Sequence, residues 1–247
     1  MPNNKKIYFA SDVHLGLNTA FSMREREVRF VRWLDTVRHD AEAIFLLGDI
    51  FDFWFEYKKV VPKGFIRTLG KIAEITDNGI PVHFFTGNHD LWAFDYLPEE
   101  IGVILHTKPY ETELMGKRFF LAHGDGLDVT DKGYTRLKKI FSNRFLQRCF
   151  AMIHPRIGMG FGHSWSQHSR LSKGVSVPFK GEKEGIYQFA KQKYESKHFD
   201  YFVFGHRHTP AIIDISDSSK MIILGEWIEN CQYAVFDGEK VELFRFI

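Results

Sequence analysis

An apolar run at residues 43–47 is followed at once by Gly48 and Asp49, and this junction limits the possible folds more than any other stretch. A short apolar run that ends at Gly-Asp is typical of a buried strand that stops at a glycine and leaves a carboxylate at its end. The two oxygens of such a carboxylate can bind two metal ions at once. Because Gly-Asp is also common in ordinary turns, this junction alone leaves a plain turn as the alternative.

Four other apolar runs end in the same way, each followed by polar residues that can bind metal. The runs and their polar residues are 7–10 with Asp12 and His14, 82–86 with Asn88 and His89, 118–122 with His123, and 201–204 with His206 and His208. Because strand side chains alternate, we expect Asp12 and His14 to point to one side of an extended backbone. A surface loop with a chance Asp and His is the alternative for that pair.

Helical patterns separate the first three of these strands. Ser22 and Glu25 form a capping box, and the expected inner face of the helix that follows carries Val28, Val31, Leu34 and Val37. A second helical pattern at residues 66–73 ends near Gly79. The order strand, helix, strand, helix, strand predicts an α/β fold with a partly parallel sheet, in which ligands gather at the carboxyl ends of the strands.

The later part of the chain continues this alternation and ends in strands. A hairpin is expected at residues 111–114 and 118–122, a helix at 185–197, and strands at 212–215, 221–224, 233–236 and 241–246. The last two strands are joined at Asp237-Gly238, which is a strong hairpin signal.

The 247 residues are enough for one large domain, or for one domain that carries an insertion. The two cysteines, Cys149 and Cys231, have no metal-binding spacing, so we expect a reduced protein of the cytoplasm. We also expect neither a signal peptide nor a membrane-spanning helix, because the sequence has no apolar run long enough for one.

The charge is distributed very unevenly along the chain. Residues 132–181 contain ten Lys or Arg and no Asp or Glu, whereas the rest of the chain has 23 basic and 31 acidic residues, a net charge of −8. A strongly basic insert on an acidic body indicates an anionic partner, which is a phosphate, a nucleic acid or a membrane surface.

The five motifs D-x-H, G-D-x-x-D, G-N-H-D, H-G-D and G-H-x-H, in this order, resemble those of the calcineurin-like metallophosphoesterases. Each motif alone has a high false-positive rate, but the full set, each member after a strand, is specific. The motifs run from Asp12 to His208, so the resemblance covers nearly the whole chain. It implies an α/β fold, a four-layer α/β/β/α sandwich of two mixed sheets flanked by helices. It also implies that residues 1–247 form a single domain. The basic insert, at about 130–182, is expected to be a largely helical cap insertion in this domain.

The resemblance further implies two divalent metal ions. One ion would be held by Asp12, His14, Asp49 and His208, and the other by Asp49, Asn88, His123 and His206, so that Asp49 bridges them. Oxygen and imidazole ligands without thiolates suit Mn²⁺, with Fe²⁺ or Zn²⁺ as alternatives. Two neighbouring cations activate water and neutralise the oxygens of a phosphoryl group.

His89 is the expected catalytic residue that does not bind metal. In the family, the histidine of G-N-H faces the phosphate as a general acid or a cationic group, and Asp52 would hydrogen-bond it and favour the imidazolium. A structural loop residue is the alternative for His89. Asp90 and Asp125 are expected to orient ligands or to shape turns.

A narrower resemblance links two flanking strings, at residues 123–134 and 224–227, to the UDP-2,3-diacylglucosamine hydrolases of lipid A synthesis. It implies cleavage of the substrate pyrophosphate to UMP and 2,3-diacylglucosamine 1-phosphate (lipid X). The chain departs from that group at two positions, with His89 where better-known members have Arg and Asp52 where they have Glu. The departure puts the exact substrate and any Arg-based grip on phosphate in doubt. The alternative is a metallophosphoesterase that acts on another nucleotide or on a nucleic-acid phosphodiester.

The basic insert itself favours a lipid substrate. Apolar and basic residues alternate from 134 to 153, which predicts a basic amphipathic helix suited to an anionic membrane surface. Side chains expected to line an acyl pocket are Met152, Ile157, Met159, Phe161 and Trp165, and those expected at the phosphate are Arg170 and Lys173, with Asn88, His89 and His206. The alternative is that the apolar residues only pack the insert onto the body.

These patterns together predict a nucleotide-lipid substrate and peripheral contact with the cytosolic face of the inner membrane. Neither a nucleic-acid partner nor a protein partner is expected.

Overall fold

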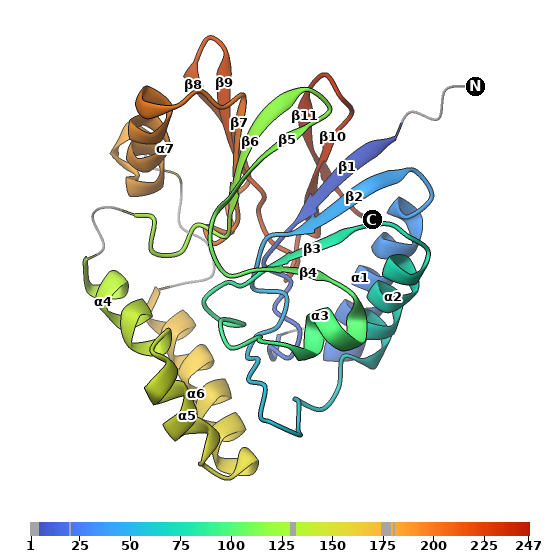
Figure 1. Cartoon of the computed structure of the whole chain (residues 1–247), viewed down its shortest axis with the longest axis vertical. Helices are drawn as coiled ribbons and strands as arrows, with labels where there is room; N and C mark the ends of the chain where they lie inside the picture. Colours follow the sequence, from blue (N-terminus) through green and yellow to red (C-terminus); the bar gives the residue numbers. More distant parts are fainter. Residues whose placement is uncertain (1–4, 20, 129–131, 174–178, 180) are drawn as a thin grey trace.

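A computed structural model describes residues 5–19, 21–128, 132–173, 179 and 181–247, and for residues 132 and 167–173 it describes the main chain alone. Two sheets pack face to face at the centre, and helices lie on their outer faces (Figure 1). This arrangement confirms the predicted sandwich of two mixed sheets.

The first sheet has the strand order β11-β10-β1-β2-β3-β4. Its strands are β1 (Lys6–Ala10), β2 (Ala41–Leu46), β3 (Val82–Phe85), β4 (Ile104–His106), β10 (Gln232–Phe236) and β11 (Val241–Arg245). Strands β1 to β4 are parallel, whereas β10 runs antiparallel to both β1 and β11. The loops that follow β1, β2 and β3 therefore leave the same edge of the sheet.

The second sheet has the order β5-β6-β7-β9-β8. Its strands are β5 (Tyr110–Leu114), β6 (Lys117–Ala122), β7 (Tyr201–Phe204), β8 (Ala211–Ser216) and β9 (Ser219–Ile223). Strands β6, β7 and β9 are parallel, and the outer strands β5 and β8 are antiparallel to their neighbours. The expected hairpins before residue 122 and after residue 232 are both present.

Three apolar layers hold the sheets and helices together. In β1, Ile7 and Phe9 face the second sheet, and Phe9 stacks on Phe45 and Phe119 with ring centroids 5.3 and 5.9 Å apart. The alternate residues Tyr8 and Ala10 face the helices instead. Helices α1 (Met23–Val37), α2 (Ile66–Asp77) and α3 (Tyr96–Ile101) cover the first sheet, and α7 (Gly185–Ser196) covers the second.

Helix α1 begins at the predicted capping box, with mutual hydrogen bonds between Ser22 and Glu25. Its inner face differs from the prediction. The buried apolar residues are Phe30, Trp33, Leu34 and Val37, whereas Val28 and Val31 are only half-buried. The reason is that the large rings set the rotation of the helix, because Phe30 and Trp33 both pack on Trp227, with ring centroids 5.1 and 5.2 Å away.

The basic insert forms α4 (Lys132–Phe141), α5 (Arg144–Ala151) and α6 (Pro155–Lys173), followed by the short 3₁₀ helix η1 (Gly181–Lys183). The single amphipathic helix expected from residue 134 to 153 is wrong, because the chain breaks at Asn143. The Asn143 side chain accepts hydrogen bonds from the main-chain N–H groups of Phe145 and Leu146, so it begins a new helix.

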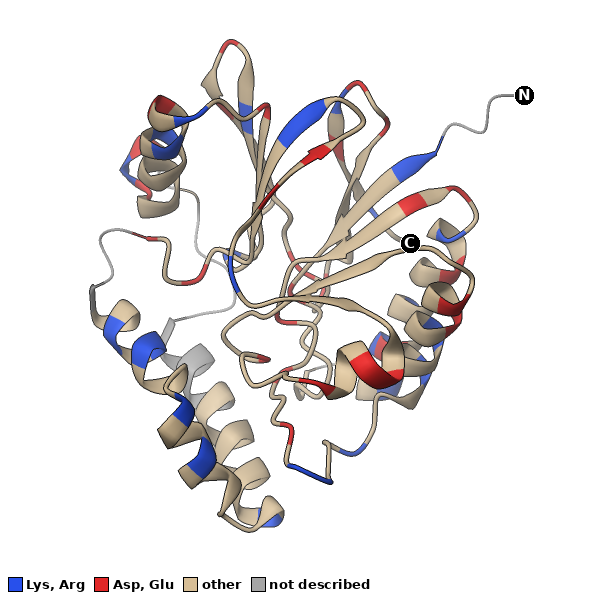
Figure 2. Cartoon of the chain, in the orientation of Figure 1, with Lys and Arg blue, Asp and Glu red and all other residues tan. Residues whose placement is uncertain are grey.

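The three insert helices, α4 to α6, are called the cap below, and aromatic contacts hold the cap against the body. Trp92 Nε1 donates to the main-chain oxygen of Phe141 at 2.8 Å, and the Phe150 ring lies 4.8 Å from both Phe55 and Trp92. Figure 2 shows Lys and Arg along the cap helices and no acidic residue. None of the helices in the described part of the chain has both the length and the hydropathy needed to cross a membrane.

Candidate metal centre

The loops that follow β1, β2, β3, β6 and β7 meet at one edge of the sandwich, where all the predicted ligands lie. Main-chain hydrogen bonds join the first two loops in a short ladder, from Asp12 N to Gly48 O at 3.0 Å and from His14 N to Asp49 O at 2.9 Å. Gly205 N likewise donates to His123 O at 2.9 Å. The loops are therefore tied to one another through the backbone, independently of their side chains.

Five of the predicted ligands have a left-handed main chain. The φ angles are 56° for Asp12, 48° for His14, 54° for Asp49, 66° for His206 and 55° for His208. The extended backbone expected for Asp12 and His14 is therefore wrong, because the chain turns at each residue. Left-handed conformations cost energy in residues other than glycine and gather at functional sites, where the surrounding structure enforces them.

Glycines let these loops approach one another closely. A Cβ atom on Gly87 would lie 2.2 Å from Asp49 Oδ1, and one on Gly48 would lie 2.8 Å from the main-chain nitrogen of Gly87. Neither space admits a side chain, so both motifs need their glycines for packing. Gly48, with a φ of 86°, also has a left-handed main chain that favours glycine.

One group of donors consists of Asp12, His14 and His208, whose ligand atoms all lie within 4.8 Å of one another. His208 Nε2 is 3.1 Å from Asp12 Oδ1, and His14 Nε2 is 3.7 Å from the same oxygen. His14 Nε2 also lies 3.8 Å from Asp49 Oδ2, which reaches toward this group from the second loop.

A second group consists of Asp49, His123 and His206. His123 Nε2 lies 3.3 Å from Asp49 Oδ2, while its other ring nitrogen, Nδ1, lies 2.7 Å from the main-chain oxygen of Leu47. That second contact fixes the ring so that Nε2 faces the carboxylate. Asp49 therefore stands between the two groups, as the predicted bridging role requires.

Unsatisfied polar atoms test whether this centre fits metal ions. Asp12 Oδ1, Asn88 Oδ1 and His123 Nε2 are buried and have no hydrogen-bond partner among the described residues. Buried polar atoms rarely stay unpaired, and carboxylate, amide and imidazole donors suit divalent transition metals. The residues present fit two such ions.

The charges favour ionised carboxylates at the centre. Burial would raise the pKa of Asp12, but His208 and the neighbouring histidines outweigh it and hold that pKa below its usual range. Burial opposes ionisation of Asp49 in the same way, and His123 and His89 hold its pKa well below the ordinary value. Both side chains are therefore ready to bind cations at neutral pH.

His89 lies between the two donor groups and itself forms a third group with His14 and Asp49, whose ligand atoms all lie within 4.8 Å of one another. Its Nε2 is 4.0 Å from Asp49 Oδ2, and its Nδ1 is 2.8 Å from the main-chain oxygen of Asp52. The Asp52 carboxylate accepts a hydrogen bond from Ser166 of the cap at 2.9 Å and lies 3.6 Å from His14 Nδ1. The pairing of the Asp52 carboxylate with His89 stays a prediction, and the main-chain contact is an additional means of orienting the ring.

Asp90 joins the second and third loops. Its buried carboxylate accepts hydrogen bonds from the main-chain N–H groups of Gly87 at 2.6 Å, Ile50 at 2.8 Å and Asp49 at 3.2 Å. Burial, and then the charge of Asp49, raise the pKa of Asp90 to about 7. The geometry agrees with the orienting role expected for this residue.

Arg26 is a residue of the site that the sequence did not reveal. Its buried guanidinium donates from Nη1 to the main-chain oxygen of His14 at 3.1 Å, and it also donates to the carbonyls of Val13 and Leu17. These oxygens belong to the loop that carries Asp12 and His14. An arginine in the first turn of a helix is usually solvated, and the predicted inner face of this helix does not include Arg26, so no sequence pattern indicated this role.

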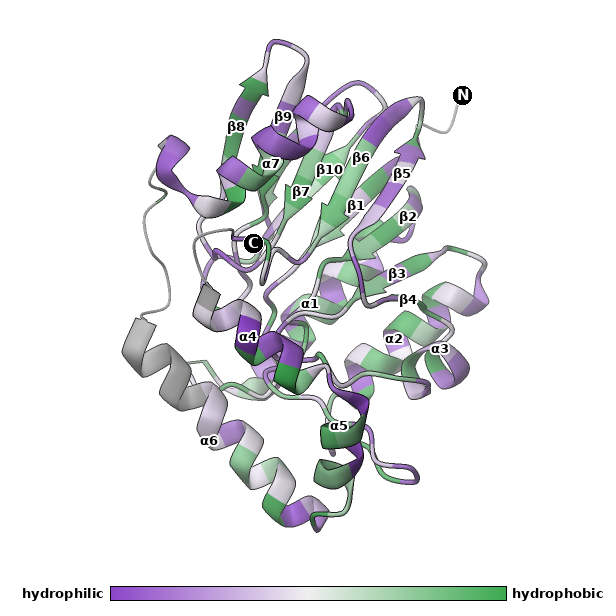
Figure 3. Ribbon diagram, turned by 60° about the vertical axis from the view of Figure 1, so that its left-hand side comes forward, coloured by the Kyte–Doolittle hydropathy of each residue, from purple (hydrophilic) through white to green (hydrophobic). Residues whose placement is uncertain are grey.

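The cap residues that were predicted to line an acyl pocket or to meet the phosphate differ in their exposure to solvent. Met152, Ile157, Phe161 and Trp165 are exposed and Met159 is half-buried, so these side chains are open to solvent and do not enclose an acyl pocket among the described residues. Figure 3 shows hydrophobic residues interspersed with hydrophilic ones along α5 and α6. The side chains of Arg170 and Lys173 lie outside the described residues. Asp125, next to His123, accepts hydrogen bonds from Tyr134 and Lys138 of α4, each at 2.7 Å.

Comparison with solved structures supports the fold. The structure of TT1561 from Thermus thermophilus matches with a TM-score of 0.50 and 11% identity, covering 98% of this chain and 99% of that one.

Two curated relatives share more of the sequence. A UDP-2,3-diacylglucosamine hydrolase of Porphyromonas gingivalis is 40% identical in an alignment that covers 96% of each chain. A UDP-2,3-diacylglucosamine hydrolase of Shewanella halifaxensis is 26% identical, again over 96% of each chain.

The sequence model of the family described as calcineurin-like phosphoesterase matches residues 5–210, which include every predicted ligand. Together with the histidine and aspartate groups described above, this match indicates that the centre binds divalent metal ions. The chain belongs to the calcineurin-like phosphoesterase family.

Proposed function

We propose that this protein is a metal-dependent hydrolase that cleaves the pyrophosphate of UDP-2,3-diacylglucosamine to UMP and 2,3-diacylglucosamine 1-phosphate. The observation that carries the proposal is the pair of donor groups on either side of Asp49, in a chain that is 40% identical to a UDP-2,3-diacylglucosamine hydrolase over nearly its full length. A pyrophosphate suits this arrangement because its oxygens offer negative charge to two cations at once.

Each donor group would hold one divalent ion, with Mn²⁺ as the proposed metal. The first ion would be bound by Asp12, His14, Asp49 and His208, and the second by Asp49, Asn88, His123 and His206. When bound, the ions activate the attacking water and neutralise the phosphoryl oxygens. The chain contributes fixed positions, because the left-handed loops and their main-chain ladder hold the donors in place.

His89 would protonate the leaving group or stabilise negative charge on the phosphoryl group. The carbonyl of Asp52 lies 2.8 Å from Nδ1, so an Nδ1–H would donate to it, which leaves Nε2 to face the centre. The carboxylate of Asp52, which accepts a hydrogen bond from Ser166 and lies beside His14, would stabilise positive charge on the His89 ring.

The cap would receive the acyl chains and contact the membrane. Its exposed apolar side chains include Phe145 and Met152, with exposed fractions of 71% and 85%, and Arg144 and Arg148 are exposed on the same helix as Phe145. Exposed apolar groups among basic ones suit an anionic lipid surface. Residues 1–247 would therefore form a single domain with α4 to α6 as its cap, acting at the cytosolic face of the inner membrane.

The test is turnover by purified protein that has been stripped of metal and reloaded with Mn²⁺. UDP-2,3-diacylglucosamine in detergent micelles should give UMP and the lipid phosphate in equal amounts, and the Asp49→Asn variant should give neither. A panel of soluble nucleotide diesters tests the alternative substrate class. Faster hydrolysis of a nucleotide diester than of the nucleotide lipid would overturn the proposed substrate.

A further inference from the structure

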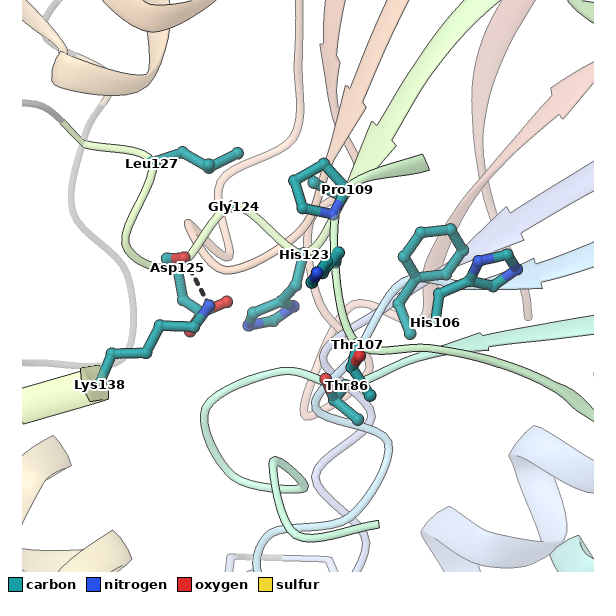
Figure 4. A pocket seen from close by; sticks show the side chains of 12 residues that line it. Thr86, His106, Thr107, Pro109, His123, Gly124, Asp125, Leu127 and Lys138 are labelled. Atoms are coloured by element: carbon teal, nitrogen blue, oxygen red, sulfur yellow. Dashed lines mark hydrogen bonds and ion pairs between the residues drawn. The ribbon is translucent and has the colours of Figure 1, made fainter. Parts of the chain in front are cut away.

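A cleft with an empty volume of about 310 Å³, part of it open to solvent, lies beside His123 of the second donor group (Figure 4). Its walls come from the ends of β3, β4 and β6, the loop after β6, and the cap. They are formed by Phe85, Thr86, His106, Thr107, Lys108, Pro109, Ala122, His123, Gly124, Asp125, Leu127 and Lys138. His123, a donor of the proposed second metal site, lines the cleft, so a ligand bound there would lie beside the metal centre.

The cleft is lined by both polar and apolar groups, as small-molecule sites usually are. The hydroxyl groups of Thr86 and Thr107 offer hydrogen bonds, while Pro109 and Leu127 offer apolar surface. A few polar groups among apolar ones orient a small ligand and give it specificity. A nucleoside has the same mixture, with a flat base, ribose hydroxyls and ring carbonyls.

The two lysines of the cleft differ in their surroundings. Lys138 Nζ is 2.7 Å from Asp125 Oδ2 and donates to the main-chain oxygen of Asp125 at 3.0 Å, so its charge is already balanced (Figure 4). Lys108 is exposed and makes no ion pair with any carboxylate in the described part of the chain. Its positive charge is available to an anionic ligand.

We propose that this cleft binds the nucleoside monophosphate half of the substrate, with Lys108 as the cation that binds its phosphate. The proposal rests on the proposed function. The acyl half needs apolar surface, which the cap offers, whereas the nucleotide half needs hydrogen bonds and positive charge, which the cleft offers. The G-N-H-D motif of this chain has His89 and no arginine. Lys108 would therefore supply a positive charge for the phosphate that this motif does not supply through an arginine.

The first experiment measures UMP binding to the Mn²⁺-loaded protein by calorimetry. Lys108→Ala should weaken UMP binding about tenfold, which is the effect of losing one charge-assisted contact, and Lys108→Arg should restore most of it. Lys63→Ala is the matched control, because Lys63 is also exposed and lies in a loop that does not line the cleft. Mn²⁺ affinity and melting temperature should stay unchanged in all three variants.

The second experiment separates the nucleoside from its phosphate. Thr107→Val should weaken the binding of UMP and leave the binding of inorganic phosphate unchanged, because only the nucleoside would contact that hydroxyl. Equal losses for both probes, or UMP binding that is the same in Lys108→Ala and in the unmodified protein, would overturn the proposal.

Steady-state kinetics distinguish this proposal from the proposed function. If UDP-2,3-diacylglucosamine is hydrolysed with the same KM in the unmodified protein and in Lys108→Ala, the cleft assignment is wrong and the function stands. If UMP binding depends on Lys108 but the nucleotide lipid is not hydrolysed, the cleft assignment stands and the proposed substrate is wrong.

Discussion

His14 Nε2 lies 3.2 Å from His208 Nε2, and both face the Asp12 carboxylate. Two imidazole nitrogens this close share a cation or a proton, because their lone pairs otherwise repel each other. Removal of metal should therefore destabilise the fold around this pair. At a metal concentration of about 100 times Kd, binding contributes roughly 3 kcal/mol, so chelation should lower the melting temperature by about 6–12 °C. Scanning calorimetry with and without chelator measures this, and an unchanged melting temperature would contradict metal binding at the pair.

The Asp49→Asn and His89→Ala variants should separate metal binding from catalysis. Asparagine offers one oxygen and no charge, so Asp49→Asn should abolish occupancy by two metals. His89→Ala should keep both metals and lose roughly 10²- to 10⁴-fold in kcat, the contribution of a general acid. Metal analysis of both proteins checks the division of roles, and a His89→Ala protein without metal would show that His89 is a ligand instead.

The Arg26→Lys variant should weaken metal binding by more than its loss of stability explains. A lysine ammonium cannot reproduce the fork of a guanidinium, so the carbonyls of His14 and Leu17 would no longer be held together. We expect Mn²⁺ affinity to fall about tenfold, as for other residues that orient metal ligands. At saturating Mn²⁺ the metal sites of Arg26→Lys should be filled, and kcat should recover. A simple unfolding defect would not give this recovery.

Glu27→Gln is the matched control for Arg26. Glu27 is buried on the same turn of α1, but its carboxylate accepts hydrogen bonds from the main-chain N–H groups of Arg67 and Thr68 at the start of α2. This variant should lower the melting temperature and leave Mn²⁺ affinity unchanged. A parallel fall in affinity and stability for both variants would reduce Arg26 to a structural role.

His83 should make the protein less stable in mild acid. Burial, and then the charge of His106, lower the pKa of His83 to about 4, from an ordinary value of 6.5. Between these values the unfolded chain binds a proton that the folded chain does not, so stability falls as pH decreases from 6.5 to 4. The loss is about 1–2 kcal/mol after allowance for partial exposure of the ring.

The His83→Phe variant tests this pH dependence. Phenylalanine can keep the stack on Phe45, whose ring centroid lies 4.3 Å from that of His83, but it cannot take up a proton. Urea unfolding at several pH values should give a shallower decline for His83→Phe than for the unmodified protein. The exposed His39 provides a control, since His39→Gln should leave the slope unchanged.

The strand ends were predictable because each combines a short apolar run with a polar motif. The runs before Asp12, Asp49 and His123 correspond to β1, β2 and β6, and the order of strands and helices along the chain predicted an α/β fold with a partly parallel sheet. The sandwich of two sheets was expected only from the family resemblance. The convergence of the motifs followed from parallel strands, whose carboxyl ends share one edge.

Other features depended on contacts that the pattern of apolar and polar residues does not encode. The break at Asn143 lies within a continuous basic amphipathic pattern, and only the capping contacts of its side chain reveal it. The role of Arg26 depends on a loop that precedes it, and the inner face of α1 depends on Trp227, far along the chain. The left-handed backbone at Asp12 and His14 follows from the ladder to the loop after β2.

That ladder has a consequence for the order in which the centre is assembled. Because Asp12 and His14 are bonded through their main chains to Gly48 and Asp49, the loops acquire their shape when β1 and β2 pair, before any ion arrives. The ion then enters a frame that is already rigid, so little chain entropy remains to be lost on uptake. Exchange of one cation for another would accordingly alter reactivity while the architecture around it stays the same.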